Sequence, residues 1–325
     1  MDFAVYARLF VGLPILVASD MLVGTRLRTA GLQFVRGDFI RREDVPAFER
    51  AVARLARSRD SVVATIVLVS LAALGAWTLT IEAVNGVGTG GWRSVMLPEG
   101  HALRYSLAAL WNHLVAVPVV LFLLYRWLWR ILIWTVFLVD VARLDLQLVP
   151  THADKAGGLG FLEVAHESFA GIAFAMGAVI SAGAAFRVVY EGAALASFGF
   201  PLVVLVTITQ LLFLGPLLVF CPALARSRRT ALASYGALVD RYNRAFQGKW
   251  IGEPPADERL LGSPDIQSLA DLGNSFRFVH EMGITPFGRR AVLQLAFAAT
   301  IPLAPLLLLV VPTSQIVGTL LKLVL

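Results

Sequence analysis

The chain has 325 residues, of which 58% are hydrophobic and 15% are charged, and its formal net charge is +6. Because soluble domains carry about 25% charged residues, this composition excludes an ordinary soluble protein and predicts an integral membrane protein in contact with the lipid bilayer. The single cysteine, Cys221, excludes an intramolecular disulfide. The basic residues follow the predicted membrane topology, so we expect no nucleic-acid partner.

The first predicted element is an apolar segment at 1–23. Arg8, Pro14 and Asp20 interrupt it, so it either crosses the membrane or lies at the interface, and we expect Asp20 to be interfacial. We interpret it as a retained segment because it lacks the basic start and the cleavage site of a signal peptide.

Residues 24–60 hold nine arginines and are predicted to be a cytoplasmic helical segment. Asp44 and Pro46 are typical of a helix start. The apolar residues that follow have helical spacing, and we expect this helix to run directly into a second span at 61–83. The members of the apolar stripe are Phe48, Val52 and Leu55.

The longest apolar stretch is 105–148, and it contains Arg126 and Arg130. An unbroken helix of this length would be about 65 Å long, roughly twice the hydrocarbon thickness of a bilayer. The helix must therefore project from the membrane or break, and Pro118 is the predicted kink.

Two placements of the membrane give these arginines different roles. A span at 106–125 puts both at the cytoplasmic interface, within an aromatic belt of Trp127, Trp129 and Trp134. A span at 116–139 puts them near mid-bilayer, where a charge costs about 2.5–3.5 kcal/mol and requires water or a partner. Helical geometry places four polar residues on one side of this helix: Asn112, Arg126, Arg130 and Asp140.

A glycine-rich cytoplasmic turn at 150–161 precedes a span at 168–188 in which small residues recur every four positions. This spacing favours close helix packing, either at the centre of the bundle or at a subunit interface, and we expect a homo-oligomer formed through 168–188. A fifth span follows at 198–224, and its polar residues are expected to face inward. These residues are Thr207, Thr209 and Gln210.

The cytoplasmic region at 226–290 is predicted to hold two helices. The first is amphipathic, and the second begins at Ser263, Pro264 and Asp265, which suit the cap, the first turn and the helix dipole. We expect the cytoplasmic regions to pack together into one helical bundle. The last predicted span is 291–311, within a final segment at 291–325 whose tail is interfacial.

Two of these cytoplasmic stretches, THADKAGGLGFL at 151–162 and SPDIQSLADLGNSF at 263–276, resemble segments of a group of bacterial polytopic inner-membrane proteins. The resemblance implies a prokaryotic multi-pass membrane protein. It carries over no catalytic residue and no substrate.

Together these patterns predict an all-α integral membrane protein with about six transmembrane helices, or five if the first segment is interfacial, and with helical cytoplasmic extensions. Residues 61–225 form the predicted membrane core. The loops on one side of the membrane contain 21 of the 28 lysines and arginines. The positive-inside rule places this side in the cytoplasm of a bacterial inner membrane.

Two groups of residues are candidates for a functional site. The first is an ion pathway through the membrane core, formed by Asn112, His113, Arg126, Arg130, Asp140, Thr207 and Gln210. The second is a ligand- or ion-contacting loop at the membrane edge, formed by His152, Asp154, Lys155, Gly157, Gly158, Glu163, His166 and Glu167.

Histidine and carboxylates on one helix face can bind a metal ion. However, His166 and Glu167 lack the second histidine of a zinc-binding H-E-x-x-H motif, and we expect no metal, no cofactor and no catalytic residue. The alternative for this loop is a structural turn in which Asp154 accepts hydrogen bonds from backbone amides and orients the following helix.

The intramembrane polar residues favour an oligomeric channel or transporter for a small ion. Arg126 and Arg130 favour an anion, and Asp140 is expected to neutralise one of them at rest. One alternative is a non-enzymatic scaffold or regulatory subunit with a cytoplasmic helical docking surface. Another is a metal-dependent enzyme at the membrane face.

Overall fold

The computed structural model describes residues 3–85, 94–96, 103–252 and 262–306, most of which are helical. Within these residues, five helical segments are long and apolar enough to cross a membrane. They are Ala7–Arg36, Val62–Leu79, Leu107–Ala142, Gly160–Glu191 and Leu195–Phe213. The fold is therefore that of an all-α, multi-pass membrane protein, as predicted.

The first helix is longer than the predicted apolar segment. Helix α1 (Phe3–Tyr6), a π-helical stretch (Ala7–Gly12) and α2 (Leu13–Arg36) follow one another as one rod. The helix continues past residue 23 because Ala30 and Phe34 are buried against the rest of the protein, although arginines line its outer side. Residue 23 therefore separates an apolar from a more polar part of one continuous helix.

A short 3-10 turn (Arg42–Asp44) leads into α3 (Val45–Arg59), which confirms the predicted helix start. The apolar stripe is partly different from the prediction, because Ala51 is buried while Val52 is exposed. Helix α3 does not run directly into the second span.

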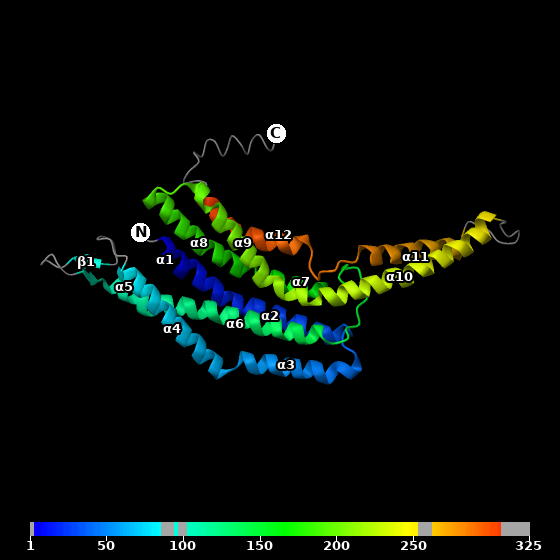
Figure 1. The fold of residues 1–325 in the computed structure, drawn as a ribbon, viewed down its shortest axis with the longest axis horizontal. Helices are drawn as coiled ribbons and strands as arrows, with labels where there is room; N and C mark the ends of the chain where they lie inside the picture. The colour runs from blue at the N-terminus through cyan, green and yellow to red at the C-terminus, as the bar shows by residue number, and fades with distance from the viewer. Residues whose placement is uncertain (1–2, 86–93, 97–102, 253–261, 307–325) are drawn as a thin grey trace.

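Helix α4 (Val62–Asn85) begins anew after a break at Asp60 and Ser61. The Ser61 side chain accepts a hydrogen bond from the Ala64 N–H at 3.2 Å, as an N-cap residue does. The two helices consequently meet at a bend (Figure 1).

After a short antiparallel pair of strands, β1 (Ser94–Met96) and β2 (Leu103–Tyr105), the chain enters its longest helix. Helix α5 (Leu107–Trp111), a π-helical stretch (Asn112–Ala116) and α6 (Val117–Ala142) are continuous over 36 residues. Pro118 therefore does not break the helix. It lies in the first turn of α6, directly after the π-helical stretch, where a missing backbone donor is tolerated.

The next elements are α7 (Gly160–Glu167), α8 (Ala170–Glu191), a 3-10 turn (Leu195–Phe198) and α9 (Gly199–Phe213). The small-residue stripe of α8 packs against α12 (Arg289–Thr300) of the same chain. A Cβ atom added to Gly177 would lie 2.0 Å from the Ala299 carbonyl oxygen. The stripe is therefore at an intramolecular helix contact and is not available as the predicted subunit interface.

The C-terminal part of the chain forms a projecting helical hairpin. A 3-10 stretch (Gly215–Phe220) leads into α10 (Cys221–Phe246) and a π-helical stretch (Gln247–Gly252), and α11 (Pro264–Glu281) returns alongside α10. The predicted start of α11 is confirmed, because Ser263 Oγ accepts a hydrogen bond from Asp265 N–H at 3.2 Å.

The hairpin extends beyond the other helices, whereas α3 lies against α6 (Figure 1). The expected single bundle of all the cytoplasmic regions was therefore wrong. Helix α12 continues into a 3-10 turn (Ile301–Leu303), and the end of the predicted last span and the tail lie outside the described residues.

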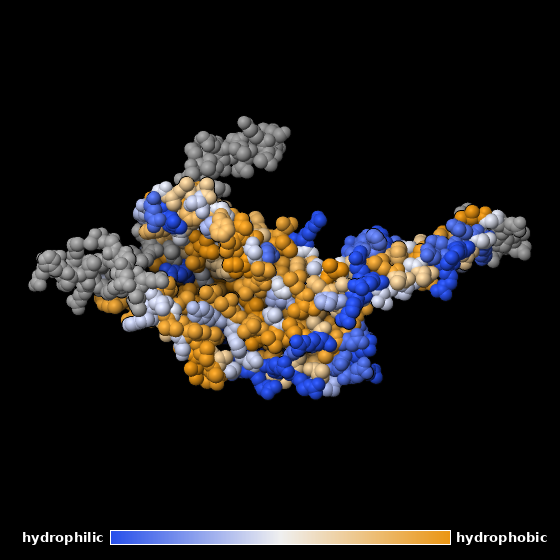
Figure 2. All heavy atoms as spheres, viewed as in Figure 1, coloured by the Kyte–Doolittle hydropathy of each residue, from blue (hydrophilic) through white to orange (hydrophobic). Residues whose placement is uncertain are grey.

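A cluster of aromatic rings packs in the core near the start of α10. Phe34 of α2 contacts Phe48 of α3, Phe137 of α6, Phe161 of α7 and Phe220 before α10. Hydrophobic side chains cover the bundle in Figure 2, while hydrophilic ones gather around α3 and along the hairpin. The cluster therefore ties five elements together where the apolar bundle meets the polar side of the protein.

Candidate functional site

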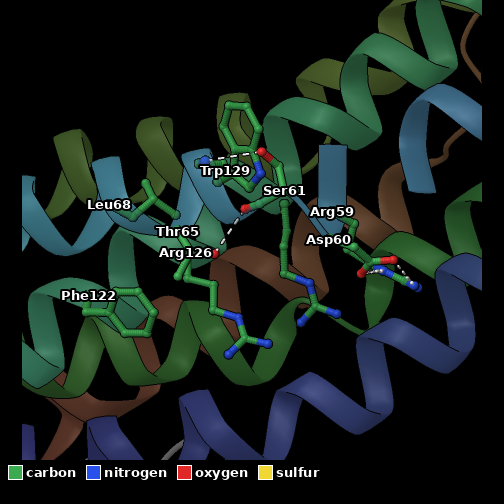
Figure 3. Close-up of a pocket in the computed structure, with 10 residues that line it drawn as sticks. Arg59, Asp60, Ser61, Thr65, Leu68, Phe122, Arg126 and Trp129 are labelled. Atoms are coloured by element: carbon green, nitrogen blue, oxygen red, sulfur yellow. Dashed lines mark hydrogen bonds and ion pairs between the residues drawn. The ribbon is translucent and has the colours of Figure 1, made fainter. Parts of the chain in front are cut away.

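A pocket of about 410 Å³ lies between the bend that joins α3 to α4 and the middle of α6. Its basic side chains are Arg59, Arg126 and Arg130. The other lining residues are Asp60, Ser61, Ala64, Thr65, Leu68, Phe122 and Trp129. Figure 3 shows Arg126 extending from α6 toward α2, with Phe122 and Leu68 to one side of it. The pocket therefore combines cationic, hydroxyl and apolar walls.

The two arginines of α6 share one carboxylate on α2. Arg130 forms an ion pair with Asp20, and Arg126 Nη2 lies 3.7 Å from Asp20 Oδ2. The Arg130 guanidinium also lies 5.0 Å from the centre of the Trp127 ring, a cation–π contact. The guanidinium lies beside Gly24, where an added Cβ would be in ordinary contact with Arg130 Nη2 at 3.5 Å.

Asp140 does not neutralise either of these arginines. Its Oδ2 atom accepts a hydrogen bond from Arg54 Nη1 of α3 at 2.9 Å. Asp140 lies nearly three helical turns beyond Arg130, opposite α3 rather than α2. The predicted pair with Asp140 was therefore wrong, and Asp20 is the carboxylate that lies against these arginines.

Arg126 and Arg130 lie beside the point where the polar helix α3 ends and the apolar helix α4 begins. Trp129 Nε1 donates a hydrogen bond to the Ser58 carbonyl at 3.1 Å, so this turn of α6 lies beside the end of α3. The apolar helix α4 begins at Val62, directly after that point. A bilayer covering the apolar part of α4 therefore has Arg126 and Arg130 at its edge, where long arginine side chains reach headgroups.

The predicted aromatic belt is largely internal. Trp127 and Trp134 are only 5% and 3% exposed, and the Trp127 indole N–H donates to the Leu16 carbonyl of α2 at 3.1 Å. These rings therefore join helices to one another rather than forming a belt around them. Trp129 is the member that lines the pocket.

The remaining predicted pathway residues do not join the arginines in one described cavity. Asn112 is buried and His113 is partly buried in the π-helical stretch before α6. Thr207 is on the exposed side of α9, contrary to the expected inward orientation, whereas Thr209 is buried. Gln210 Nε2 donates a hydrogen bond to the Val292 carbonyl of α12 at 3.0 Å, so it joins two helices.

The glycine-rich loop is organised around Asp154. Its two carboxylate oxygens accept hydrogen bonds from the backbone N–H groups of Ala156, Gly158 and Gly160 at 2.9, 3.1 and 2.7 Å. Burial opposes the charged form, but these amides and His152 stabilise it more, so the pKa of Asp154 lies below its ordinary value. The geometry is that of the structural turn that the sequence offered as the alternative to a ligand-contacting loop.

The same loop fastens the base of the hairpin to the bundle. Lys155 Nζ pairs with Glu281 Oε2 of α11 at 2.7 Å, and the Lys155 carbonyl accepts a hydrogen bond from Gly283 N–H at 2.7 Å. Gly157 and Gly158 have φ angles of +64° and +95°, which favour glycine. A Cβ at Gly158 would lie 2.5 Å from the Phe39 ring, so the loop depends on glycine for its packing as well.

His166 is separated from the two acidic residues of α7. It is 1% exposed, its Nε2 accepts a hydrogen bond from the Trp134 indole N–H at 2.9 Å, and its Nδ1–H donates to the Phe213 carbonyl. Glu167 Oε1 instead lies 3.6 Å from Arg290 Nε of α12, while Glu163 lies beside Gly288. Among the described residues, no group of three or more His, Cys, Asp or Glu is arranged to hold a metal ion.

Asp20 is a site residue that the sequence prediction missed, as it also missed Arg59 and Ser61 of the pocket. The available signal was an acidic residue in one apolar segment and two basic residues in another, because charges at membrane depth pair with one another. The two segments are far apart in the sequence, so the prediction did not place Asp20 beside the arginines. Comparisons with protein families, curated proteins and solved structures find no match to this chain.

Proposed function

We propose that this protein is a non-enzymatic membrane scaffold whose α10–α11 hairpin docks a partner with an acidic surface. The observation that supports the proposal is the position of the hairpin, which projects beyond the bundle and is joined to the glycine-rich loop at its base (Figure 1). Such an element presents two long helices to a partner without rearrangement of the membrane helices.

The charge of α10 supports the chemistry of the partner, whereas α11 carries three acidic residues, Asp265, Asp271 and Glu281, and one arginine, Arg277. Residues 221–252 contain six basic residues and one acidic residue, Asp240. Lys249 pairs with Asp265 at 2.9 Å, and Arg228 donates to the His280 carbonyl at 3.0 Å, so these two stabilise the hairpin itself. The other four basic side chains are exposed or nearly so along α10, where an acidic surface can reach them. They are Arg226, Arg229, Arg241 and Arg244.

The experiment is quantitative co-purification from native membranes with three tagged proteins. The first is the natural chain, the second replaces the four arginines by lysine, and the third replaces them by glutamate. We expect one or more proteins with acidic surfaces to be enriched with the natural chain and the lysine variant and to be lost with the glutamate variant. Electrostatic complementarity tolerates lysine but not reversed charge.

A matched control is the double substitution R50E and R57E, which reverses exposed arginines on α3. Equal loss of partners in this control would show that net charge, rather than the hairpin, governs binding. An unchanged set of proteins across all variants would contradict the proposal.

The second candidate function is passage of a small anion, and the three arginines that line one pocket favour it. In this proposal Arg126 and Arg130 attract the ion, while Asp20 in place of Asp140 balances their charge. Chloride flux into liposomes that contain the purified protein is the measurement. Flux that falls when both arginines are replaced by alanine supports this candidate, and absence of flux in the natural protein removes it.

We further propose a bacterial inner-membrane location with the hairpin and the glycine-rich loop in the cytoplasm, as the distribution of basic residues predicts. Homo-oligomerisation also stays a proposal. It would require a surface other than the α8 stripe, because that stripe contacts α12.

A further inference from the structure

We propose that the pocket between α4 and α6 binds the phosphate of an anionic phospholipid. This site does not depend on the docking function of the hairpin, because the two lie on different parts of the molecule (Figure 1). The argument rests on the charge of the pocket, on its position along α4 and α6, and on the character of its walls.

The pocket and its immediate surroundings carry a surplus of positive charge. Three arginines line it, while Asp60 and the neighbouring Asp20 supply two carboxylates. Asp60 is used by Arg59, with the two contacts at 2.9 and 3.0 Å. Asp20 is used mainly by Arg130, since its approach to Arg126 is the longer one at 3.7 Å. The Arg126 guanidinium is therefore the group best placed to bind an added anion.

The Arg126 guanidinium is suited to bind the phosphate of an incoming ligand. The Arg126 side chain is 50% exposed, so it reaches an incoming ligand while its stem packs beside Phe122 (Figure 3). Guanidinium groups bind phosphate oxygens through two parallel hydrogen bonds. The Ser61 hydroxyl, directly before α4, lines the same pocket and can donate to a phosphate oxygen, while the Thr65 hydroxyl already donates to the Ser61 carbonyl at 3.1 Å.

The position of the pocket favours a lipid as the source of the phosphate. Its polar residues lie at the bend before α4, and Ala64 and Leu68 continue the wall along the apolar helix. On the same side of α4 as the pocket, Leu71 and Leu79 are apolar and exposed. A headgroup in the pocket would leave its acyl chains along this surface, so one molecule satisfies both the charged and the apolar part.

Native mass spectrometry of the delipidated full chain in detergent tests the proposal. The probes are phosphatidylglycerol and the zwitterionic phosphatidylcholine, each titrated into the natural protein and into an Arg59→Ala, Arg126→Ala double variant. We expect preferential binding of phosphatidylglycerol and a loss of affinity of about tenfold in the variant. Arg130 is left in place because it pairs with Asp20 and packs on Trp127.

Arg57→Ala is the matched control, since it removes one exposed arginine of α3 that does not line the pocket. Arg126→Lys is a second variant that keeps the charge and is expected to retain part of the affinity. Equal affinity in the double variant and the Arg57→Ala control would overturn the site. Displacement of the lipid by millimolar inorganic phosphate would overturn the lipid assignment, because the pocket would then be a site for a soluble anion.

Discussion

The Asp154 carboxylate accepts three backbone hydrogen bonds in the glycine-rich loop. Replacement by asparagine removes the charge and one of the two oxygens that accept backbone N–H groups. We expect a loss of stability on the order of 2–3 kcal/mol, because buried amides are left without a good acceptor. The measurement is the melting temperature of the purified protein in detergent.

The same residue predicts a pH dependence. The pKa of Asp154 is lowered in the folded protein, so its contribution is present above the ordinary carboxyl value of 3.8 and is lost as the pH falls through the lower folded pKa. The difference in melting temperature between the natural protein and D154N should therefore shrink on going from about pH 6 toward pH 3. Asp145→Asn is the control, because this exposed residue pairs with Arg41 and should matter little at any pH.

His166 is expected to stabilise the junction of α6, α7 and α9. His166→Phe removes the acceptor of the Trp134 indole N–H and the donor to the Phe213 carbonyl, which leaves two buried polar groups unpaired. The expected cost is about 2–4 kcal/mol. The Trp134→Phe, His166→Phe double variant should recover part of this loss, as measured by a double-mutant cycle of thermal stability.

His152→Phe supplies the comparison for this residue, because the His152 side chain is 48% exposed. A small effect there together with a large effect at His166 is the expected pattern. Equal effects at both histidines would contradict the assigned role of the buried one.

At the scale of elements, the contact between α8 and α12 depends on small residues. Gly177→Ala places a Cβ against the Ala299 backbone and should force the two helices apart, lowering the melting temperature by several degrees. Gly183→Ala on the same helix has no atom within 4 Å of the added Cβ, so it should be neutral or slightly stabilising. If both variants melt alike, the close contact is not important for stability.

The long helix formed by α5 and α6 illustrates why element length alone misleads. Its 36 residues correspond to about 54 Å, more than a bilayer requires. The excess is apolar because Phe137, Leu138 and Val141 pack in the core beside α3. Hydropathy therefore reports burial in protein and exposure to lipid with the same signal.

At the scale of the whole molecule, the proposed orientation is open to a labelling test. In a chain with Cys221→Ala, the only cysteine is removed, so a single new cysteine can report one position. Arg244→Cys on the hairpin should react with a membrane-impermeant maleimide in inside-out vesicles and not in intact spheroplasts. Arg187→Cys, near the C-terminal end of α8, should show the reverse, because that end of the helix lies away from the hairpin (Figure 1). Labelling of the hairpin position from outside would refute the orientation.

The sequence by itself determined the class of the protein and several local features. Composition and hydropathy established an all-α membrane protein, and the caps at Asp44 and Ser263 marked two helix starts correctly. These features are predictable because each depends on residues within a few positions of one another. The turn geometry of Asp154 was among the alternatives for the same reason.

Only the tertiary structure decided which charges meet and which helix faces are covered. Asp20 lies beside Arg130, Arg54 reaches Asp140 across 86 positions, and the α8 stripe is filled by α12. The hairpin's projection from the bundle is decided at the same level. Such pairings depend on how segments far apart in the chain pack. The residues around a charge or a small residue do not specify which distant residue it will contact. Hydrophobic burial stabilises many pairings of apolar helices almost equally, and shape together with charge complementarity selects among them.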